Sequence, residues 1–208
     1  MPIPEDRESR YDGATVTPDD VLELWIGSGA PLAKSAQWWT KDPAFDQELL
    51  ETFGQTHELA SRGALDTWKT TPRGRLALVI LLDQFSRNMY RNTPRSFAQD
   101  ARACALALEA IVTGDEQALS TIERSFLYMP LMHAEDVDLQ HKCVAAFERL
   151  RDDAPIDLRA YVENTLGYAH KHAEVIERFG RFPHRNDILG RASRPDELEF
   201  LTQPGSSF

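Results

Sequence analysis

The chain has 208 residues, of which 42% are hydrophobic, and a formal net charge of -10 at pH 7. This length and apolar content suffice for one substantial hydrophobic core, so we expect a single domain. An acidic average surface repels nucleic acids and anionic membranes, which excludes both as bulk partners. The longest apolar run, Leu76 to Leu82, is far shorter than the roughly 20 residues that span a bilayer. No secretory signal pattern is visible at the N-terminus, so we expect a cytoplasmic protein.

Helix signals follow one another along the first half of the chain. Helix starts are predicted where a capping residue precedes proline, at Thr17-Pro18, Asp42-Pro43, Thr71-Pro72 and Thr93-Pro94. The matching helix ends are predicted at Gly27, Gly63, Asn92 and Gly114. We interpret residues 1–16 as an irregular extension before the domain, which spans residues 17–208.

Helical patterns continue through the second half. They predict a short helix over residues 122–128 that ends at Pro130, longer helices over 135–150 and 155–179, a turn through 183–190 and a last helix that starts at Ser193. No segment alternates apolar and polar residues as a half-buried strand does. The sequence therefore predicts an all-α, single-domain bundle of about 8 to 10 helices.

The helix that starts at Pro72 has apolar residues on two opposite faces, so we expect it to be packed on both sides. Asp83 and Arg87, four residues apart, fall within one of those faces. Buried polar groups need partners, and leaving one unpaired costs about 1–3 kcal/mol. We therefore predict that both residues are largely buried and bonded, directly or through one intermediary, to the loop from Arg181 to Asn186.

Three blocks together resemble a known family. They are Leu81-Leu-Asp-Gln-Phe-Ser-Arg-Asn-Met-Tyr-Arg91, Phe126-Leu-Tyr-Met-Pro-Leu-Met-His-Ala-Glu-Asp136 and Phe179-Gly-Arg-Phe-Pro-His-Arg-Asn-Asp-Ile-Leu-Gly-Arg191. The segment Trp38-Trp-Thr-Lys-Asp-Pro-Ala-Phe-Asp46 is similar to its N-terminal block. Through these blocks, the chain resembles the bacterial domain-of-unknown-function family nine-two-four. The resemblance implies an all-helical fold with tetratricopeptide-like antiparallel helix pairs, and it implies no settled activity.

Arginines concentrate in two segments of this acidic chain. Residues 83–95 contain three arginines and one aspartate, and residues 178–194 contain five arginines and one aspartate. A local basic patch suits a small anionic ligand, although pairing with the chain's own carboxylates would explain it equally well. The candidate ligand-binding residues are Asp83, Arg87, Asn88, Arg91, His172, Arg181, His184, Arg185 and Asn186.

The candidate acid or base residues are His133, His184, Glu135 and Asp136. Helix capping alone would explain Glu135 and Asp136, which we expect in the first turn of a helix. The spacing of the six histidines matches no metal-binding motif, so we predict no metal site. We also predict no other cofactor.

Two functions fit these residues. The first is binding of a small anionic ligand in a pocket, where the bound ligand could also be hydrolysed. The second is a non-enzymatic helical adaptor that binds a peptide or protein partner, with Trp38, Trp39 and Trp68 as apolar anchors. The sequence contains neither a nucleophile motif nor a phosphate-binding glycine loop, so motifs of this kind do not decide between the two functions. The sequence leaves the oligomeric state open, and a homo-oligomer is one of the alternatives.

Overall fold

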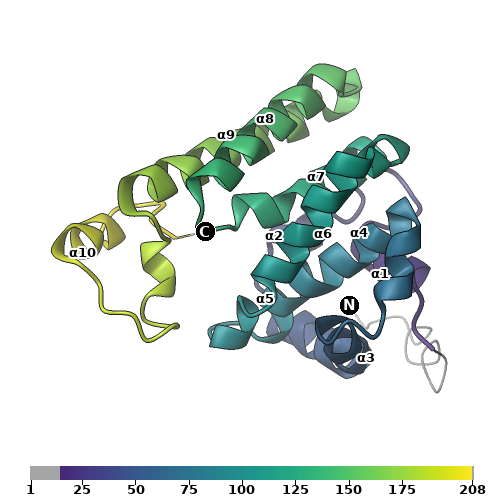
Figure 1. The fold of residues 1–208 in the computed structure, drawn as a ribbon, viewed down its shortest axis with the longest axis horizontal. Coiled ribbons are helices and arrows are strands. Elements are labelled where there is room, and N and C mark those ends of the chain that lie inside the picture. Colours follow the sequence, from purple (N-terminus) through teal and green to yellow (C-terminus); the bar gives the residue numbers. More distant parts are fainter. Residues whose placement is uncertain (1–14, 208) are drawn as a thin grey trace.

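The computed structural model describes residues 15–207, and among these residues it contains helices and no β-strand (Figure 1). The α-helices are α1 Pro18–Trp25, α2 Ser35–Trp39, α3 Pro43–Ser61, α4 Pro72–Ile80, α5 Ser86–Met89, α6 Asp100–Thr113, α7 Thr121–Met132, α8 Val137–Asp153, α9 Ile156–Phe179 and α10 Pro195–Leu201. Short 3-10 turns lie at Asp66–Thr70, Pro94–Ser96, Asp115–Ala118 and Pro183–Arg185, and a π-helical turn at Leu81–Phe85. The all-α prediction is confirmed. Most of the predicted N-terminal extension, residues 1–14, lies outside the described residues.

Three of the four predicted helix starts are confirmed by their caps. The side chains of Thr17, Asp42 and Thr71 accept hydrogen bonds from backbone amides of the helices that follow them. The fourth prediction was wrong, because Pro94 opens only a 3-10 turn and α6 begins at Asp100. The Thr93 hydroxyl donates backward to the carbonyl of Tyr90 and so does not cap the amides ahead of it.

The predicted ends of the first helices are confirmed by backbone geometry. Gly27, Gly63, Asn92 and Gly114 all adopt positive φ, between 61° and 82°. The prediction that a helix ends at Pro130 was wrong, because α7 continues to Met132. A proline inside a helix removes one hydrogen bond. Here every residue from Ser125 to Met132 is buried, so packing offsets that loss.

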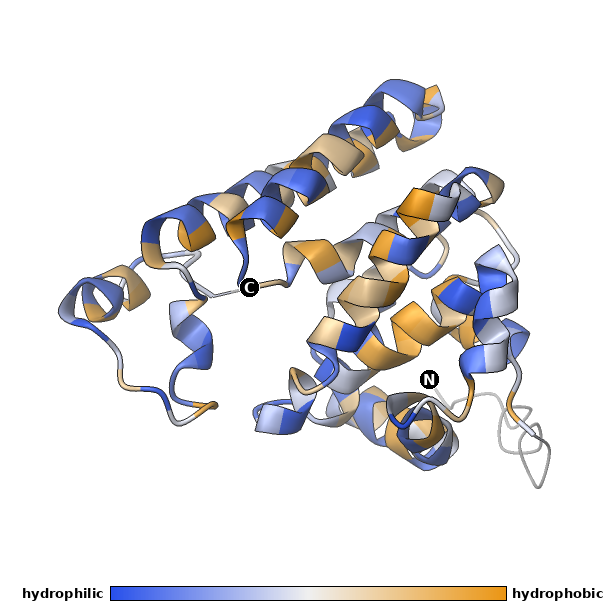
Figure 2. Ribbon diagram, viewed as in Figure 1, coloured by the Kyte–Doolittle hydropathy of each residue, from blue (hydrophilic) through white to orange (hydrophobic). Residues whose placement is uncertain are grey.

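Helix α4 lies at the centre of the main apolar core. It packs against α1, α6 and α7, and residues Leu76–Ile80 are at most 1% exposed. Figure 2 shows this segment as one of the most hydrophobic parts of the ribbon. The expected packing on both faces is confirmed. The predicted single helix, however, is interrupted by the π-helical turn Leu81–Phe85 before α5 begins. Such turns widen a helix locally and are frequent at functional sites.

Helices α8 and α9 form an antiparallel pair joined at Ala154 and Pro155, and they lie side by side in Figure 1. After α9 ends at Phe179 and is capped by Gly180, the chain folds back through residues 183–190 and closes with α10. A second, small apolar cluster of Val175, Ile176, Phe179 and Phe182 supports α10 through Phe200. The tetratricopeptide-like arrangement stays a prediction. Within residues 15–207, every helix falls short of the length and apolarity that crossing a bilayer requires.

Candidate functional site

Asp83 is a fully buried carboxylate that the π-helical turn points into the molecule. Its carboxylate hydrogen-bonds to His133 Nδ1 at 2.7 Å and accepts from Gln84 Nε2 at 2.6 Å. It also forms an ion pair with Arg87 Nη1 at 3.0 Å. Burial by itself raises the pKa of Asp83, but Arg87 and His133 together bring it below its usual range. Asp83 is therefore ionised at neutral pH.

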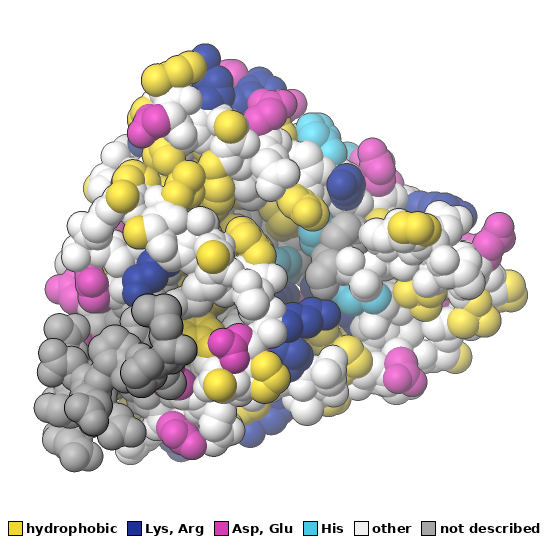
Figure 3. Space-filling model, turned by 180° about the vertical axis from the view of Figure 1, so that it is seen from behind, with side chains coloured by type: hydrophobic (Ala, Val, Ile, Leu, Met, Phe, Trp, Pro, Cys, Tyr) yellow, Lys and Arg dark blue, Asp and Glu magenta, His cyan; other side chains and the backbone are white. Residues whose placement is uncertain are grey.

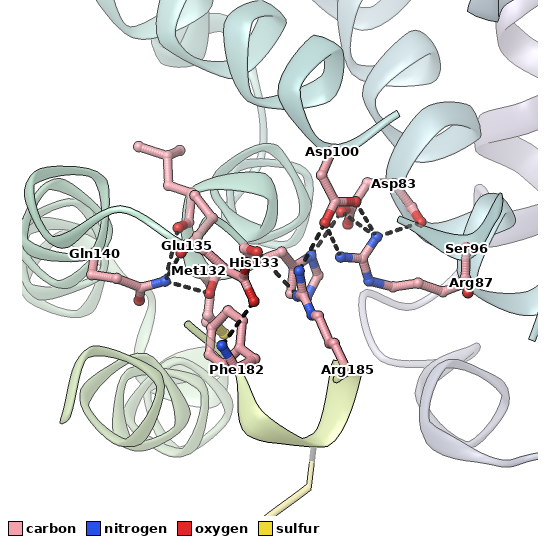
Figure 4. A network of polar contacts seen from close by, with 12 residues as sticks. Asp83, Arg87, Ser96, Asp100, Met132, His133, Glu135, Gln140, Phe182 and Arg185 are labelled. Atoms are coloured by element: carbon pink, nitrogen blue, oxygen red, sulfur yellow. Dashed lines mark hydrogen bonds and ion pairs between the residues drawn. The ribbon is translucent and has the colours of Figure 1, made fainter. Parts of the chain in front are cut away.

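Asp100 links this carboxylate to the loop after α9. Arg87 binds Asp100 with both terminal nitrogens, at 2.9 and 3.0 Å, and Arg185 Nη1 donates to the same carboxylate at 3.2 Å. Arg185 Nη2 also donates to the backbone carbonyl of His133 at 3.0 Å. Figure 4 shows these side chains turned toward one another from separate elements. The prediction that Asp83 and Arg87 reach the 181–186 loop through one intermediary is confirmed.

A pocket of about 580 Å³ opens beside this network. Figure 3 shows histidine and basic side chains gathered around a hollow near the middle of the face turned away from Figure 1. The charged residues that line the pocket are Lys41, Arg87, Arg91 and Arg185, and no aspartate or glutamate is among its described lining residues. A larger hollow of about 670 Å³ near α1 is lined by four carboxylates, one arginine and otherwise uncharged residues, and it contains none of the predicted site residues.

Three predicted histidines, His133, His172 and His184, line the same pocket. Burial and the neighbouring His133 lower the pKa of His172 to about 3, and burial and Arg185 lower that of His184 to about 4. Burial and Arg87 also lower the pKa of His133. The pocket therefore presents neutral imidazoles at pH 7. Between residues 15 and 207, no three His, Cys, Asp or Glu side chains are grouped to hold a metal ion.

Asn88 and Arg91 are held in the pocket wall by Asp46 of α3. Asp46 accepts from Arg91 at 2.8 and 3.0 Å and from Asn88 Nδ2 at 2.9 Å. Two parallel bonds of this kind fix the plane of a guanidinium. Arg91 is still 30% exposed, so it can also meet a ligand.

Arg181 and Asn186 lie outside the pocket lining, where they fasten α10 instead. Both donate to Glu197, a fully buried carboxylate, and Arg181 does so with two nitrogens at 2.6 and 2.7 Å. Arg194 contributes its backbone amide at 2.7 Å and a side-chain contact at 3.1 Å. The hydrogen bonds from Arg181 chiefly lower the pKa of Glu197, to about 2. These two residues, which we predicted to contact a ligand, hold α10 in place through Glu197.

Glu135 and Asp136 also have structural partners. Glu135 accepts from the backbone amide of Phe182 at 2.8 Å and from Arg191 at 2.6 and 2.9 Å. Asp136 caps α8 by accepting from the amide of Leu139 at 2.9 Å. The expectation that both lie in the first helical turn was wrong, because α8 begins at Val137. Neither residue lines the pocket.

Sequence reasoning missed Asp46, Asp100, Gln84 and Phe97. Asp46 and Asp100 each lie in the first turn of a helix, where a carboxylate is ordinary, so nothing local marks them. Phe97 faces the guanidinium of Arg185, whose carbon is 4.6 Å from the ring centre, and Phe182 faces it from 4.5 Å. The sequence offered one general signal for the two carboxylates, which is that buried arginines require carboxylate partners.

Fold and site together define an all-helical protein with a basic, histidine-lined pocket. A family model described as a bacterial protein of unknown function, DUF924, matches residues 21–205, and the chain belongs to this family. A solved structure of a protein of unknown function from Agrobacterium tumefaciens is similar, with a TM-score of 0.76 and 37% sequence identity. The likeness covers 88% of this chain and 96% of that one. Among curated proteins, no match is found.

Proposed function

We propose that this protein binds a small anionic ligand in the pocket between α2, α5, α7 and the loop that follows α9. The observation that carries this proposal is the separation of charge around the pocket. Lysine and arginine line it, whereas the carboxylates that orient them, Asp46, Asp83 and Asp100, are absent from the described lining. The cytoplasmic location expected from the sequence belongs to the same proposal.

The environment of Arg185 is the most direct argument for an anionic ligand. Burial lowers its pKa to about 10, and repulsion from Arg87 adds to this shift. Its Nε is buried and makes no hydrogen bond to any described residue. Arg185 shares the carboxylate of Asp100 with Arg87, so the charge of Arg185 itself is only partly compensated. An incoming anion would relieve that repulsion.

Apolar side chains form the rest of the wall, among them Trp39, Phe97 and Met129. Trp39 is 59% exposed, which is a large apolar face to leave in water. We infer that the ligand joins an anionic group to an apolar part. The adaptor alternative gains no support from Trp38, because this residue is buried and donates its Nε1 to the carbonyl of Trp25 at 2.6 Å.

Thermal-shift and calorimetric titrations with orthophosphate, succinate and adenosine monophosphate test the proposal. A ligand at 100 times its dissociation constant adds about 2.7 kcal/mol to stability, which is several degrees in melting temperature for a chain of this size. We expect Lys41→Gln and His184→Ala to weaken binding about tenfold, equivalent to about 1.4 kcal/mol.

The matched control is Arg159→Gln, which removes a positive charge from an exposed position outside the pocket. This variant should bind like the unaltered protein. A panel in which no anion shifts the melting temperature would contradict the proposal. So would binding that Lys41→Gln and His184→Ala leave unchanged.

A further inference from the structure

His133 and Asp83 form a buried imidazole–carboxylate pair with a defined tautomer. Asp83 is ionised and can only accept, so His133 Nδ1, 2.7 Å from Oδ1, carries the proton. The second nitrogen, Nε2, then has a free lone pair for accepting a proton. Arg87 and Gln84 hold Asp83 in place, and the carbonyl of His133 is held by Arg185.

The basic nitrogen of this pair lies on the pocket side. His133 lines the pocket and its side chain is 15% exposed. Because Nδ1 is turned to Asp83, Nε2 is the polar atom at the opposite edge of the ring. The titratable and charged groups around the ring are Asp83, Arg87, Asp100, His172, His184 and Arg185. Burial and Arg87 lower the pKa of His133 more than Asp83 and Asp100 raise it, so a neutral imidazole is the favoured state at pH 7.

We propose that the Asp83–His133 pair is a general base that activates water to hydrolyse a small carboxylic ester carrying a second, anionic group. This inference rests on the proposed function, because the basic lining must first hold the anionic group. His133 would be the catalytic residue and Asp83 the residue that positions it. The same arrangement of base and orienting carboxylate serves proton transfer in many hydrolytic sites.

The step balances without any co-reactant other than water. Water oxygen forms a bond to the ester carbonyl carbon while His133 Nε2 takes one water proton. The tetrahedral oxyanion lies near the guanidinium groups of Arg87 and Arg185, which stabilise its charge. The bond from carbon to the leaving oxygen then breaks, and the protonated His133 returns its proton to that oxygen. The products are an acid and an alcohol.

Water is the nucleophile we assign, because none of the three hydroxyl groups in the described lining, those of Thr40, Ser96 and Ser207, is hydrogen-bonded to His133. Ser96 donates its hydroxyl to the carbonyl of Thr93, and Thr40 donates to that of Ala36. A side-chain hydroxyl that acts as nucleophile has instead to be hydrogen-bonded to its base.

The test measures release of p-nitrophenolate from mono-p-nitrophenyl succinate by the full chain. We expect saturable hydrolysis, with kcat/KM at least about tenfold higher than for the uncharged ester p-nitrophenyl acetate, since one ion pair with the carboxylate is worth about that factor. His133→Gln should lower kcat by about 100-fold or more with little change in KM. Exogenous imidazole should restore part of the activity of His133→Ala, a result that a purely structural role would not give.

The matched control is His141→Gln. His141 also pairs with a carboxylate, Glu177, at 2.7 Å, but on the surface, with 57% of its side chain exposed. This variant should keep full activity. The rate of the unaltered protein should rise with pH as His133 loses its proton, and this dependence should vanish in His133→Gln.

Two results would overturn the inference and leave the proposed function standing. One is binding of succinate, sensitive to Lys41→Gln, without hydrolysis of its ester. The other is hydrolysis that His133→Gln does not slow. Hydrolysis of p-nitrophenyl phosphate in preference to the carboxylic ester would contradict the assignment of a carboxylic ester as the substrate. Failure of every anion to bind would instead contradict the proposed function itself.

Discussion

At the scale of single residues, the site is a chain in which a neutral imidazole is followed by carboxylates and guanidinium groups in alternation. His133, Asp83, Arg87, Asp100 and Arg185 are each bonded to the next. A pair of buried charges adds little stability overall, because desolvation offsets most of the attraction. Removing one member is costly, however, since its partner is left buried and uncompensated. These residues therefore fix the geometry of the pocket wall more than they stabilise the fold.

Arg185 and His184 should respond differently to alanine substitution. Arg185→Ala leaves the carbonyl of His133 unpaired and takes one cation from Asp100, so we expect a loss of about 1–3 kcal/mol. For a chain of this length that is roughly 2–4 °C in melting temperature per kcal/mol. His184→Ala should leave the melting temperature nearly unchanged and act on binding. Urea denaturation of both variants measures the difference, and equal destabilisation by the two would contradict it.

At the scale of elements, close packing around the start of α4 positions the π-helical turn. Thr71 caps α4 by accepting from the amide of Gly74 at 3.1 Å. A side-chain carbon at Gly74 would lie 2.1 Å from the carbonyl oxygen of Trp68. The 3-10 turn Asp66–Thr70 therefore packs directly on α4, the helix that leads into the π-helical turn with Asp83. Glycine is required at position 74 for this approach of two backbones.

A matched pair of glycine substitutions tests this packing. Gly74→Ala forces the backbone of Trp68 to move, so we expect destabilisation of about 1–3 kcal/mol. Gly167→Ala lies within α9, where an added carbon meets nothing within 4 Å. It should stabilise the protein by about 0.5–1 kcal/mol, because alanine has the higher helix propensity. Chemical denaturation checks both signs, and an unchanged midpoint for Gly74→Ala would contradict the close contact.

At the scale of the whole molecule, the pocket lies where the main core meets the segment that follows α9. The main core runs from α1 to α9, and the small cluster under α10 is separate from it. Polar contacts from Glu135, Asp100 and Glu197 fasten the returning segment. Because the fastening groups are charged and the pocket histidines are buried, the stability of the whole molecule depends on pH.

We expect stability to fall as the pH is lowered from 7 to 5. Burial lowers the pKa of His57 and His184 to about 4 and that of His172 to about 3, from an ordinary value of 6.5. The unfolded chain then binds more protons than the folded one, so folding loses about 1–2 kcal/mol per histidine at pH 5. Urea denaturation across this range measures the slope. His172→Gln should reduce it, and the exposed neighbour variant His170→Gln should not.

The sequence by itself determined the helical class, most helix boundaries and the involvement of Asp83, Arg87 and Arg185 in one buried network. Capping residues, prolines and glycines act within a few residues of their own position, so local reasoning reads them well. The exceptions, Pro94 and Pro130, lie where tertiary contacts outweigh local preference.

Only the tertiary structure decided which polar residues face the pocket. Arg181 and Arg185 lie four residues apart in one block, yet one fastens Glu197 and the other reaches Asp100. Asp100 itself comes from a different helix and has no mark in the sequence. The partner of a buried charge is set by which elements pack together, and those contacts join residues up to 85 positions apart.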